Sequence, residues 1–255
     1  MAPASQETSR PFVGRAQELQ LLAAALAEAK AGRARCVLVT GEPGIGKTSL
    51  VERLLADLAH ERVDWGRCNE TEGAPAYWPW IQVVRGLIRH RSVAGVRQLA
   101  GAAGLELARL VPALGDQQTP ALDDEDDREA ARFRLFDTVA TLVRRAGADE
   151  LLAVVLEDLH WADSESLLLL DHVAGELRDT RVLLLGTYRE AELSATTSAP
   201  KLLAAVAHAA ERVALGGLAA DEVAGLLAGS GGTKPAAALV SAVHRATGGN
   251  PFFVA

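Results

Sequence analysis

The sequence predicts an α/β fold of three layers, in which helices cover both faces of a parallel sheet. Two apolar runs, residues 151–156 and 181–187, are continuous rather than alternating, which is typical of strands buried on both faces. A third run, residues 35–40, leads through a glycine-rich turn into a helical stretch. Because strands and helices alternate along the chain, we expect neighbouring strands to run parallel.

The other elements follow from local composition. Uninterrupted stretches of alanine, leucine and charged residues favour helices, and short runs of β-branched residues favour strands. The expected helices cover residues 18 to about 32, 47–60, a stretch that opens within 75–79 and ends near 90, 128–145, 220–229 and 235–246; the remaining strands cover 63–68 and 212–215. Between residues 92 and 127 the sequence predicts only short helical fragments and an exposed acidic loop at 123–127.

One face of the helix at 128–145 carries five apolar side chains at helical spacing. We assign this stripe to core packing: Phe133, Phe136, Val139, Ala140 and Val143. The aromatic stretch at 77–80 is likewise expected to fill the core.

Three segments are expected along the chain. Residues 1–11 are polar and hold two prolines, which predicts a disordered lead-in. Residues 12–215 form the α/β domain. After Gly216 and Gly217 the composition changes to alanine-rich helices, so residues 216–255 are expected to begin a small helical subdomain that is truncated here.

The composition excludes several classes of protein. A formal net charge of −7 and the lack of a basic cluster argue against nucleic-acid binding by this chain. Even the long apolar runs, such as residues 151–156, are far too short to span a membrane, and no signal sequence opens the chain. We therefore expect a cytoplasmic protein without a membrane partner. Cys36 and Cys68 lack a metal-binding spacing and are expected to be reduced core thiols.

The glycine-rich turn, residues 41–48, has the pattern G-x-x-x-x-G-K-[ST] between a predicted strand and a predicted helix. In that setting the N–H groups of a helix start can bind phosphate oxygens, and glycine lets the backbone approach them closely. Lys47 is expected to bind the β- and γ-phosphates, and Thr48 to ligate Mg²⁺. The residues expected to hold the phosphates are Gly41, Pro43, Gly44, Ile45, Gly46, Lys47, Thr48 and Ser49. The domain at 12–215 is therefore predicted to be a P-loop NTPase.

Two carboxylates, Glu157 and Asp158, follow the buried strand at 151–156, at the end where parallel sheets bind ligands. One carboxylate would hold Mg²⁺ and the other would orient the attacking water, and the sequence leaves open which does which. The alternative is that both only cap the next helix. Asp163 by itself fits the N-cap position of that helix.

Arg189 follows the next buried strand, where a guanidinium could approach the γ-phosphate from the side opposite Lys47. We interpret it as a γ-phosphate sensor; the alternative is a surface ion pair with Glu190. His160 is interpreted as a loop residue, because phosphoryl transfer to water depends mainly on positioning and charge stabilisation. The expected catalytic set is Lys47, Glu157, Asp158 and Arg189.

Five segments together resemble one family. They are residues 12–15 (FVGR), 41–48, 154–163 (VVLEDLHWAD), 187–189 (TYR) and 247–253 (TGGNPFF). In combination they are similar to the AAA-type ATPase domain of the STAND class, and most similar to the N-terminal part of the large ATP-binding regulators of the LuxR family. The resemblance covers nearly the whole chain, and it implies that the nucleotides are ATP and ADP.

The resemblance also implies residues that contact the base. In that family the segment matching Val13, Gly14 and Arg15 lies against the adenine, and the proline matching Pro251 packs on the base from the helical subdomain. Ala16 departs from the family, which often has an acidic residue there.

Two further departures concern the metal and the length of the chain. Glu157 stands where the family more commonly has aspartate, which affects the geometry around the metal. Family members continue beyond the position of Ala255 into a winged helix, a sensor array and a helix-turn-helix. We therefore expect a fragment that reaches DNA only through a C-terminal domain absent from this chain.

The expected function is a regulatory switch that binds ATP, hydrolyses it slowly and closes its helical segment onto the core, with a homo-oligomer forming on activation. A multiple-turnover AAA-type ATPase is the alternative; it would need an arginine from a neighbouring copy, such as Arg144, Arg145 or Arg178. The domain could equally regulate an appended kinase or cyclase. A small-molecule kinase is disfavoured, because no polar acceptor pocket stands out in the sequence.

Overall fold

The structure is a computed structural model that describes residues 12–58, 62–70, 73–101, 104–115, 125–192, 199–231 and 235–254. The predicted lead-in, residues 1–11, lies outside the described residues, as do residues 123–124 of the predicted acidic loop. Residues 125–127 of that loop instead open a helix.

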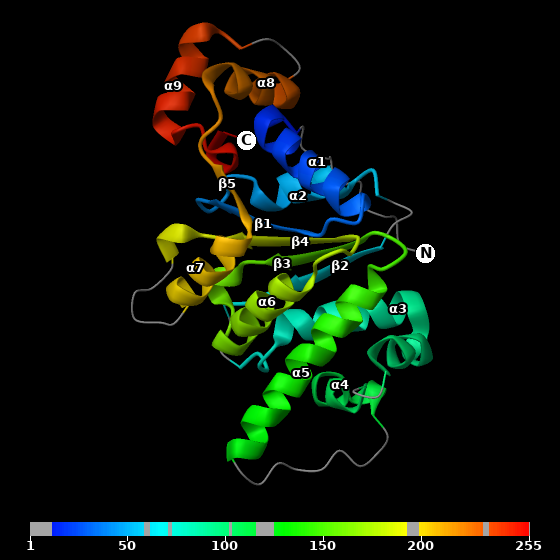
Figure 1. The fold of residues 1–255 in the computed structure, drawn as a ribbon. Coiled ribbons are helices and arrows are strands. Elements are labelled where there is room, and N and C mark those ends of the chain that lie inside the picture. The colour runs from blue at the N-terminus through cyan, green and yellow to red at the C-terminus, as the bar shows by residue number, and fades with distance from the viewer. Residues whose placement is uncertain are drawn as a thin grey trace, which may run out of the picture.

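Strands and helices alternate through most of the described chain (Figure 1). The strands are β1 (Arg35–Gly41), β2 (Arg62–Arg67), β3 (Leu152–Glu157), β4 (Val182–Tyr188) and β5 (Glu211–Leu215). The helices of the α/β part are α1 (Ala16–Lys30), α2 (Lys47–Leu55), α3 (Trp78–Ala100), α4 (Gly104–Leu110), α5 (Glu125–Ala146), α6 (Ser164–Glu176) and α7 (Ala199–Ala209). In the described chain after β5 lie the helices α8 (Ala220–Gly231), α9 (Ala237–Thr247) and α10 (Pro251–Val254). Short 3₁₀ turns are η2 (Pro112–Leu114), η3 (Leu159–Trp161) and η4 (Glu190–Glu192).

The strands of the described residues form one parallel sheet in the order β2-β3-β4-β1-β5. The predicted α/β fold with a parallel sheet is thus confirmed. Every residue of β3 and β4 is buried, because these strands lie inside the sheet and have helices on both faces. Since the strands are parallel, their carboxyl ends meet at one edge of the sheet, and the predicted site residues lie there.

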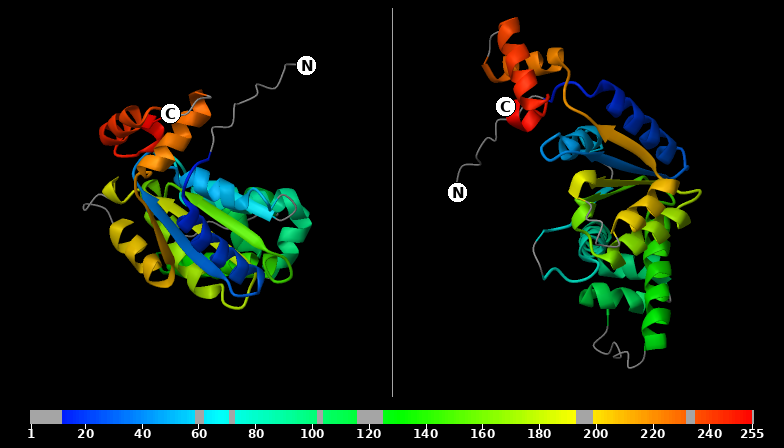
Figure 2. Two further views of the ribbon diagram at one scale, coloured as in Figure 1. Left: turned by 90° about the horizontal axis from the view of Figure 1, so that it is seen from above. Right: turned by 90° about the vertical axis from the view of Figure 1, so that its left-hand side faces the viewer.

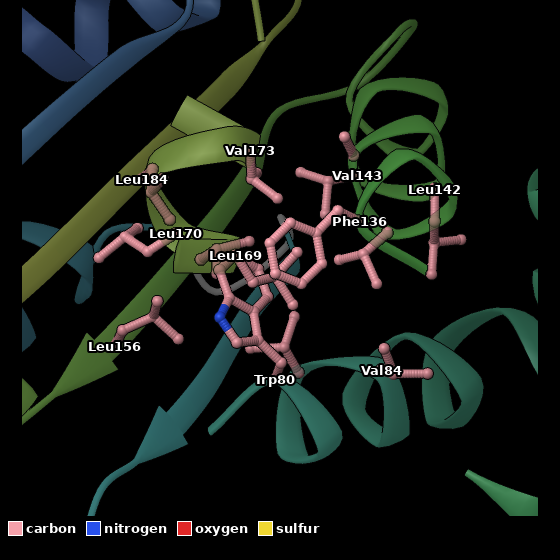
Figure 3. Packing of buried hydrophobic residues seen from close by; sticks show 14 of the residues in the cluster. Trp80, Val84, Phe136, Leu142, Val143, Leu156, Leu169, Leu170, Val173 and Leu184 are labelled. Atoms are coloured by element: carbon pink, nitrogen blue, oxygen red, sulfur yellow. The ribbon is translucent and has the colours of Figure 1, made fainter. Parts of the chain in front are cut away.

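Helices cover the sheet in two layers, each with its own core. α1 and α2 pack on one face, and α3, α5, α6 and α7 pack on the other (Figures 1 and 2). Side chains from α3, α5 and α6 meet over β3 and β4 around the fully buried Trp80 (Figure 3). The indole Nε1 of Trp80 donates a hydrogen bond to the carbonyl oxygen of Ser166 at 3.0 Å, so burial leaves its polar atom satisfied.

Helix α3 is broken at Ser92, where φ is 66° and ψ is 164°, close to the predicted helix end near residue 90, and helical structure resumes beyond the break as far as Ala100. One expectation for the second face was wrong. Phe133 is 54% exposed rather than buried, and the Arg132 guanidinium lies over its ring at 5.9 Å from the centroid. The N-terminal end of α5 projects beyond the sheet (Figure 1), so only the later members of the predicted stripe, from Phe136 onward, reach the core.

The helices after β5 share a small cluster of buried side chains apart from the two main cores. It consists of Leu218, Val223, Leu226, Val240 and Val254, with Val13 packed against it. Cys36 and Cys68 are free, as expected, and burial raises the pKa of each thiol to about 12. Within the described ranges, no helix combines the length and the apolar character that a membrane crossing requires.

Candidate functional site

The glycine-rich loop connects β1 to α2 at the carboxyl edge of the sheet. Gly41, Gly44 and Gly46 have φ values of 155°, 72° and 100°, and the last two lie in the left-handed region that favours glycine. Gly46 is the N-cap of α2 and has no side chain to cap the helix, so the helix start stays available for an anion. Ile45 anchors the loop in the core, whereas Pro43 and Ser49 are exposed.

Lys47 is the first residue of α2, directly after this loop. Its side chain is largely buried, and Nζ donates hydrogen bonds to the carbonyl oxygens of Gly41 at 2.9 Å and Glu42 at 3.0 Å. Burial and the nearby Arg189 lower the pKa of Lys47, while Asp158 and Glu192 oppose that shift. The ammonium is therefore held within the loop by neutral carbonyl groups.

Thr48 and Glu157 meet where the loop joins α2. The Thr48 hydroxyl donates a hydrogen bond to Oε1 of Glu157 at 2.7 Å, and the Glu157 side chain is almost fully buried. Its other oxygen, Oε2, accepts hydrogen bonds from Nε of Arg67 at 2.8 Å and from Nη2 at 2.5 Å. Arg67 had no role in the prediction from sequence, because its approach to Glu157 depends on the pairing of β2 with β3.

These oxygen donors suit Mg²⁺. A hydroxyl and a carboxylate are ligands of the kind it prefers, and Mg²⁺ keeps several waters and substrate phosphate oxygens as its other ligands. Among the described residues, no group of three or more His, Cys, Asp or Glu side chains gathers to hold a metal ion. The small donor set of Thr48 and Glu157 therefore fits an ion that shares its shell with a nucleotide, and not an all-protein metal site.

Asp158 follows Glu157 with a left-handed backbone, φ 58° and ψ 45°. Its N–H donates a hydrogen bond to Oγ1 of Thr187 at 3.1 Å, which ties the end of β3 to the end of β4. The side chain caps no helix. The N-cap role falls to Asp163, which accepts a hydrogen bond from the Ser166 N–H at 2.9 Å, as expected.

Arg189 follows β4 and lies among aromatic and acidic side chains. Its Nη1 donates to Oε1 of Glu192 at 2.7 Å, and its guanidinium lies over the Trp161 ring at 5.0 Å from the centroid. The predicted alternative pairing with Glu190 is not formed, because Glu190 binds Arg212 instead.

The His160 side chain is buried beside this cluster, against the Trp161 ring. Its Nε2 lies 3.2 Å from Oε2 of Glu192, without the geometry of a hydrogen bond. Burial lowers the pKa of His160, and Arg189 and Lys47 lower it further, against the opposing charges of Asp158 and Glu192. The neutral form is therefore favoured.

Arg15 connects the segment before α1 to the loop and to the chain after β5. This buried residue has a left-handed backbone, φ 64°. Its Nη2 donates to the carbonyl oxygens of Ile45 at 3.2 Å and Gly216 at 2.6 Å, and its backbone N–H donates to Glu222 at 3.3 Å. Gly14 lies against the same Glu222 side chain.

The segment that contains Pro251 lies on the phosphate loop. Nδ2 of Asn250 donates to the carbonyl oxygen of Pro43 at 2.9 Å. A Cβ added at Gly44 would come within 2.5 Å of Cβ of Phe252, so only glycine leaves room for this contact. The loop and α10 are therefore in direct contact.

The chain after β5 is held to the end of α9 by a second close approach. The Leu218 N–H donates to the carbonyl oxygen of Gly249 at 2.8 Å. A Cβ at Gly217 would lie 1.9 Å from the carbonyl oxygen of Gly248, whereas a Cβ at Gly216 would meet nothing within 4 Å.

The parallel sheet and the loop geometry define a P-loop NTPase. Residues 11–185, more than half of the chain, match the AAA ATPase domain family, and the chain belongs to that family. AAA ATPases bind nucleotide with Mg²⁺ and often oligomerise. No curated protein matches the sequence.

Three solved structures show a similar fold. The Walker-type ATPase of Pyrococcus abyssi is 14% identical with a TM-score of 0.56, and the match covers 95% of this chain and 66% of that one. The Aeropyrum pernix ORC2 protein, solved in ADPNP–ADP complexes, is 17% identical with a TM-score of 0.54, covering 97% and 62%. A STAND protein with a tetratricopeptide repeat sensor from Pyrococcus horikoshii is 18% identical with a TM-score of 0.53, covering 94% and 28%. This chain thus spans less than two thirds of the length of each.

Proposed function

We propose that the chain is the ATP-binding module of a regulatory switch, the N-terminal part of a LuxR-type transcriptional regulator. In this proposal residues 12–215 bind the nucleotide and residues 216–255 begin a helical lid. The family membership and the resemblance of the five sequence segments support it. The observation that carries the switch is the direct contact between loop and lid, made by Asn250 on Pro43 and by Phe252 on Gly44. Whatever occupies the loop therefore acts on α10 as well.

In this proposal the residues of the site have different roles. The loop amides and Lys47 would bind the phosphate oxygens of ATP or ADP. Thr48 and Glu157 would hold Mg²⁺, which neutralises phosphate charge when bound. Asp158 would orient the attacking water, and Arg189 would sense the γ-phosphate. Val13, Gly14, Arg15 and Pro251 would surround the adenine.

A calorimetric titration of the chain with Mg·ATP and Mg·ADP tests this proposal. We expect saturable binding of both, and a loss of at least about tenfold in affinity for Lys47→Ala, because a charge-assisted contact to phosphate is removed. Glu28→Gln, on α1 and paired with Arg35, is the control and should bind like the unchanged chain. A folded protein that binds neither nucleotide would overturn the proposal.

The frequent oligomerisation of AAA ATPases favours one alternative, a multiple-turnover ATPase that works as an assembly. The two functions differ in their dependence on protein concentration. A low turnover per chain that stays constant over a hundredfold range of concentration fits the switch. A turnover that rises steeply would favour the assembly, in which a neighbouring copy supplies an arginine.

A further inference from the structure

We propose that Arg67 is a positioning residue for the magnesium side of the nucleotide site, where it holds the Glu157 carboxylate against Thr48. This inference rests on the proposed function and deepens it. Arg67 belongs to no segment that carries the family resemblance. The evidence for it is the pairing of the edge strand β2 with β3, which brings Arg67 beside Glu157.

The sheet places the two side chains together. Arg67 is the register partner of Glu157 in the parallel β2–β3 pair. Residues in register on neighbouring strands point to the same face of a sheet, and here that face is the one covered by α2, which carries Thr48. The backbone of Arg67 is fixed as well, because the Gln82 side chain accepts from its N–H at 3.4 Å and donates to its carbonyl oxygen at 2.9 Å.

Because the Glu157 carboxylate is buried, its hydrogen bonds to Arg67 and Thr48 matter. The Glu157 side chain is 3% exposed, whereas that of Arg67 is 59% exposed. A carboxylate removed from water is costly unless its oxygens are hydrogen-bonded. Thr48 satisfies Oε1 and Arg67 satisfies Oε2 with two N–H groups. Without Arg67, the carboxylate would gain by turning toward water and away from Thr48.

The length of Glu157 matters to the same argument. One carboxylate reaches partners on two elements, Thr48 on α2 and Arg67 on β2. Aspartate at this position would be one methylene shorter and could not keep both contacts. The influence of Arg67 should therefore depend on a glutamate at position 157.

The experiment compares nucleotide affinity with and without the metal. ATP is titrated calorimetrically in excess Mg²⁺ and again in excess EDTA, for the unchanged chain, Arg67→Ala and Arg67→Lys. We expect Arg67→Ala to weaken Mg·ATP binding about tenfold, the usual effect of removing a partner of a metal ligand, and to leave metal-free binding within twofold. Arg67→Lys should recover part of the loss, because it restores one charged donor.

Two controls separate positioning from structure. Arg134→Ala removes another exposed guanidinium that is bonded to a more buried carboxylate. Nε of Arg134, on α5, donates a hydrogen bond to Oε1 of Glu106, on α4, at 2.9 Å. This variant should leave both affinities unchanged. In a Glu157→Asp background, Arg67→Ala should change Mg·ATP affinity by less than twofold, which is the coupling that a double-mutant cycle measures.

The outcomes are distinct. Equal weakening with and without Mg²⁺ would overturn the inference and make Arg67 a direct contact of the nucleotide. Unchanged binding by Arg67→Ala, beside a Lys47→Ala variant that has lost binding, would overturn it and leave the proposed function intact. If the unchanged chain binds no nucleotide, both the inference about Arg67 and the proposed function are overturned.

Discussion

At the scale of single residues, the arginine proposed to sense the γ-phosphate already has an anionic partner. Glu192 accepts a hydrogen bond from Arg189 at 2.7 Å, and this bond lowers the pKa of the Glu192 carboxyl. The guanidinium also lies over the Trp161 ring, 5.0 Å from the centroid. A γ-phosphate would have to compete with Glu192 for the same N–H groups. If Arg189 senses the γ-phosphate as proposed, Glu192 would reduce the preference of the site for ATP over ADP.

Glu192→Gln tests this competition. Removing the carboxylate charge frees Arg189, so we expect ATP affinity to rise about threefold and ADP affinity to stay within 1.5-fold, measured by calorimetry. Glu190→Gln is the matched control: it removes a nearby carboxylate whose partner is Arg212. An equal gain for ATP and ADP would contradict the sensor role of Arg189.

At the scale of elements, the contact between the phosphate loop and α10 depends on one glycine. Alanine at Gly44 would be strained by its φ of 72° and would also press on Phe252. We expect Gly44→Ala to cost roughly 1–3 kcal/mol in unfolding free energy and to speed amide exchange at residues 252–254 about tenfold. Exchange measured by mass spectrometry or NMR reports the second effect.

Gly32→Ala is the control for backbone strain without crowding. Its φ is 84°, and nothing lies within 4 Å of an added Cβ. It should lower stability by a similar amount and leave exchange at residues 252–254 unchanged. Identical exchange in the two variants would mean that the loop does not hold α10.

Elements were predicted well where a local pattern decides them. β3 and β4 are continuous apolar runs, and α2 follows a loop motif, so local sequence located all three. The predicted helix end near residue 90 agrees with the break at Ser92, whose backbone interrupts the helical period of α3. Phe133 fits the helical stripe, yet whether a stripe meets a neighbour depends on where the helix projects.

The site was predictable to a similar extent. Sequence alone placed Lys47 and Thr48 at the start of α2, and Glu157 and Arg189 at strand ends, which share one carboxyl edge in a parallel sheet. It could not pair Arg67 with Glu157, because that contact requires the strand order. It also could not find the partners of Arg189, because Trp161 and Glu192 come from two separate turns.

At the scale of the whole molecule, stability should depend on pH through His160. Burial lowers its pKa below the ordinary value, so the unfolded chain takes up a proton at this position before the folded chain does. Protonation of the unfolded chain begins as the pH falls through about 6.5. This histidine therefore contributes stability that is fully present above that pH and is lost as the pH falls toward its folded pKa.

We expect the unfolding free energy to fall between about pH 7 and pH 5, and the slope to be shallower in His160→Asn. Urea unfolding at several pH values measures both. His208→Asn, at an exposed histidine on α7, should keep the original slope. A His160→Asn slope equal to that of the unchanged chain would show that other groups cause the pH dependence.

The close approach of the chain after β5 to the end of α9 has a consequence for variants of this protein. Gly217 has no space for a side chain, whereas its neighbour Gly216 has open space around it. In a library of random variants selected for ATP binding, position 216 should accept many residues and position 217 almost none. Such a selection would identify Gly217 as essential, as it would a residue that contacts the nucleotide. The requirement for glycine comes instead from its close approach to the backbone carbonyl of Gly248.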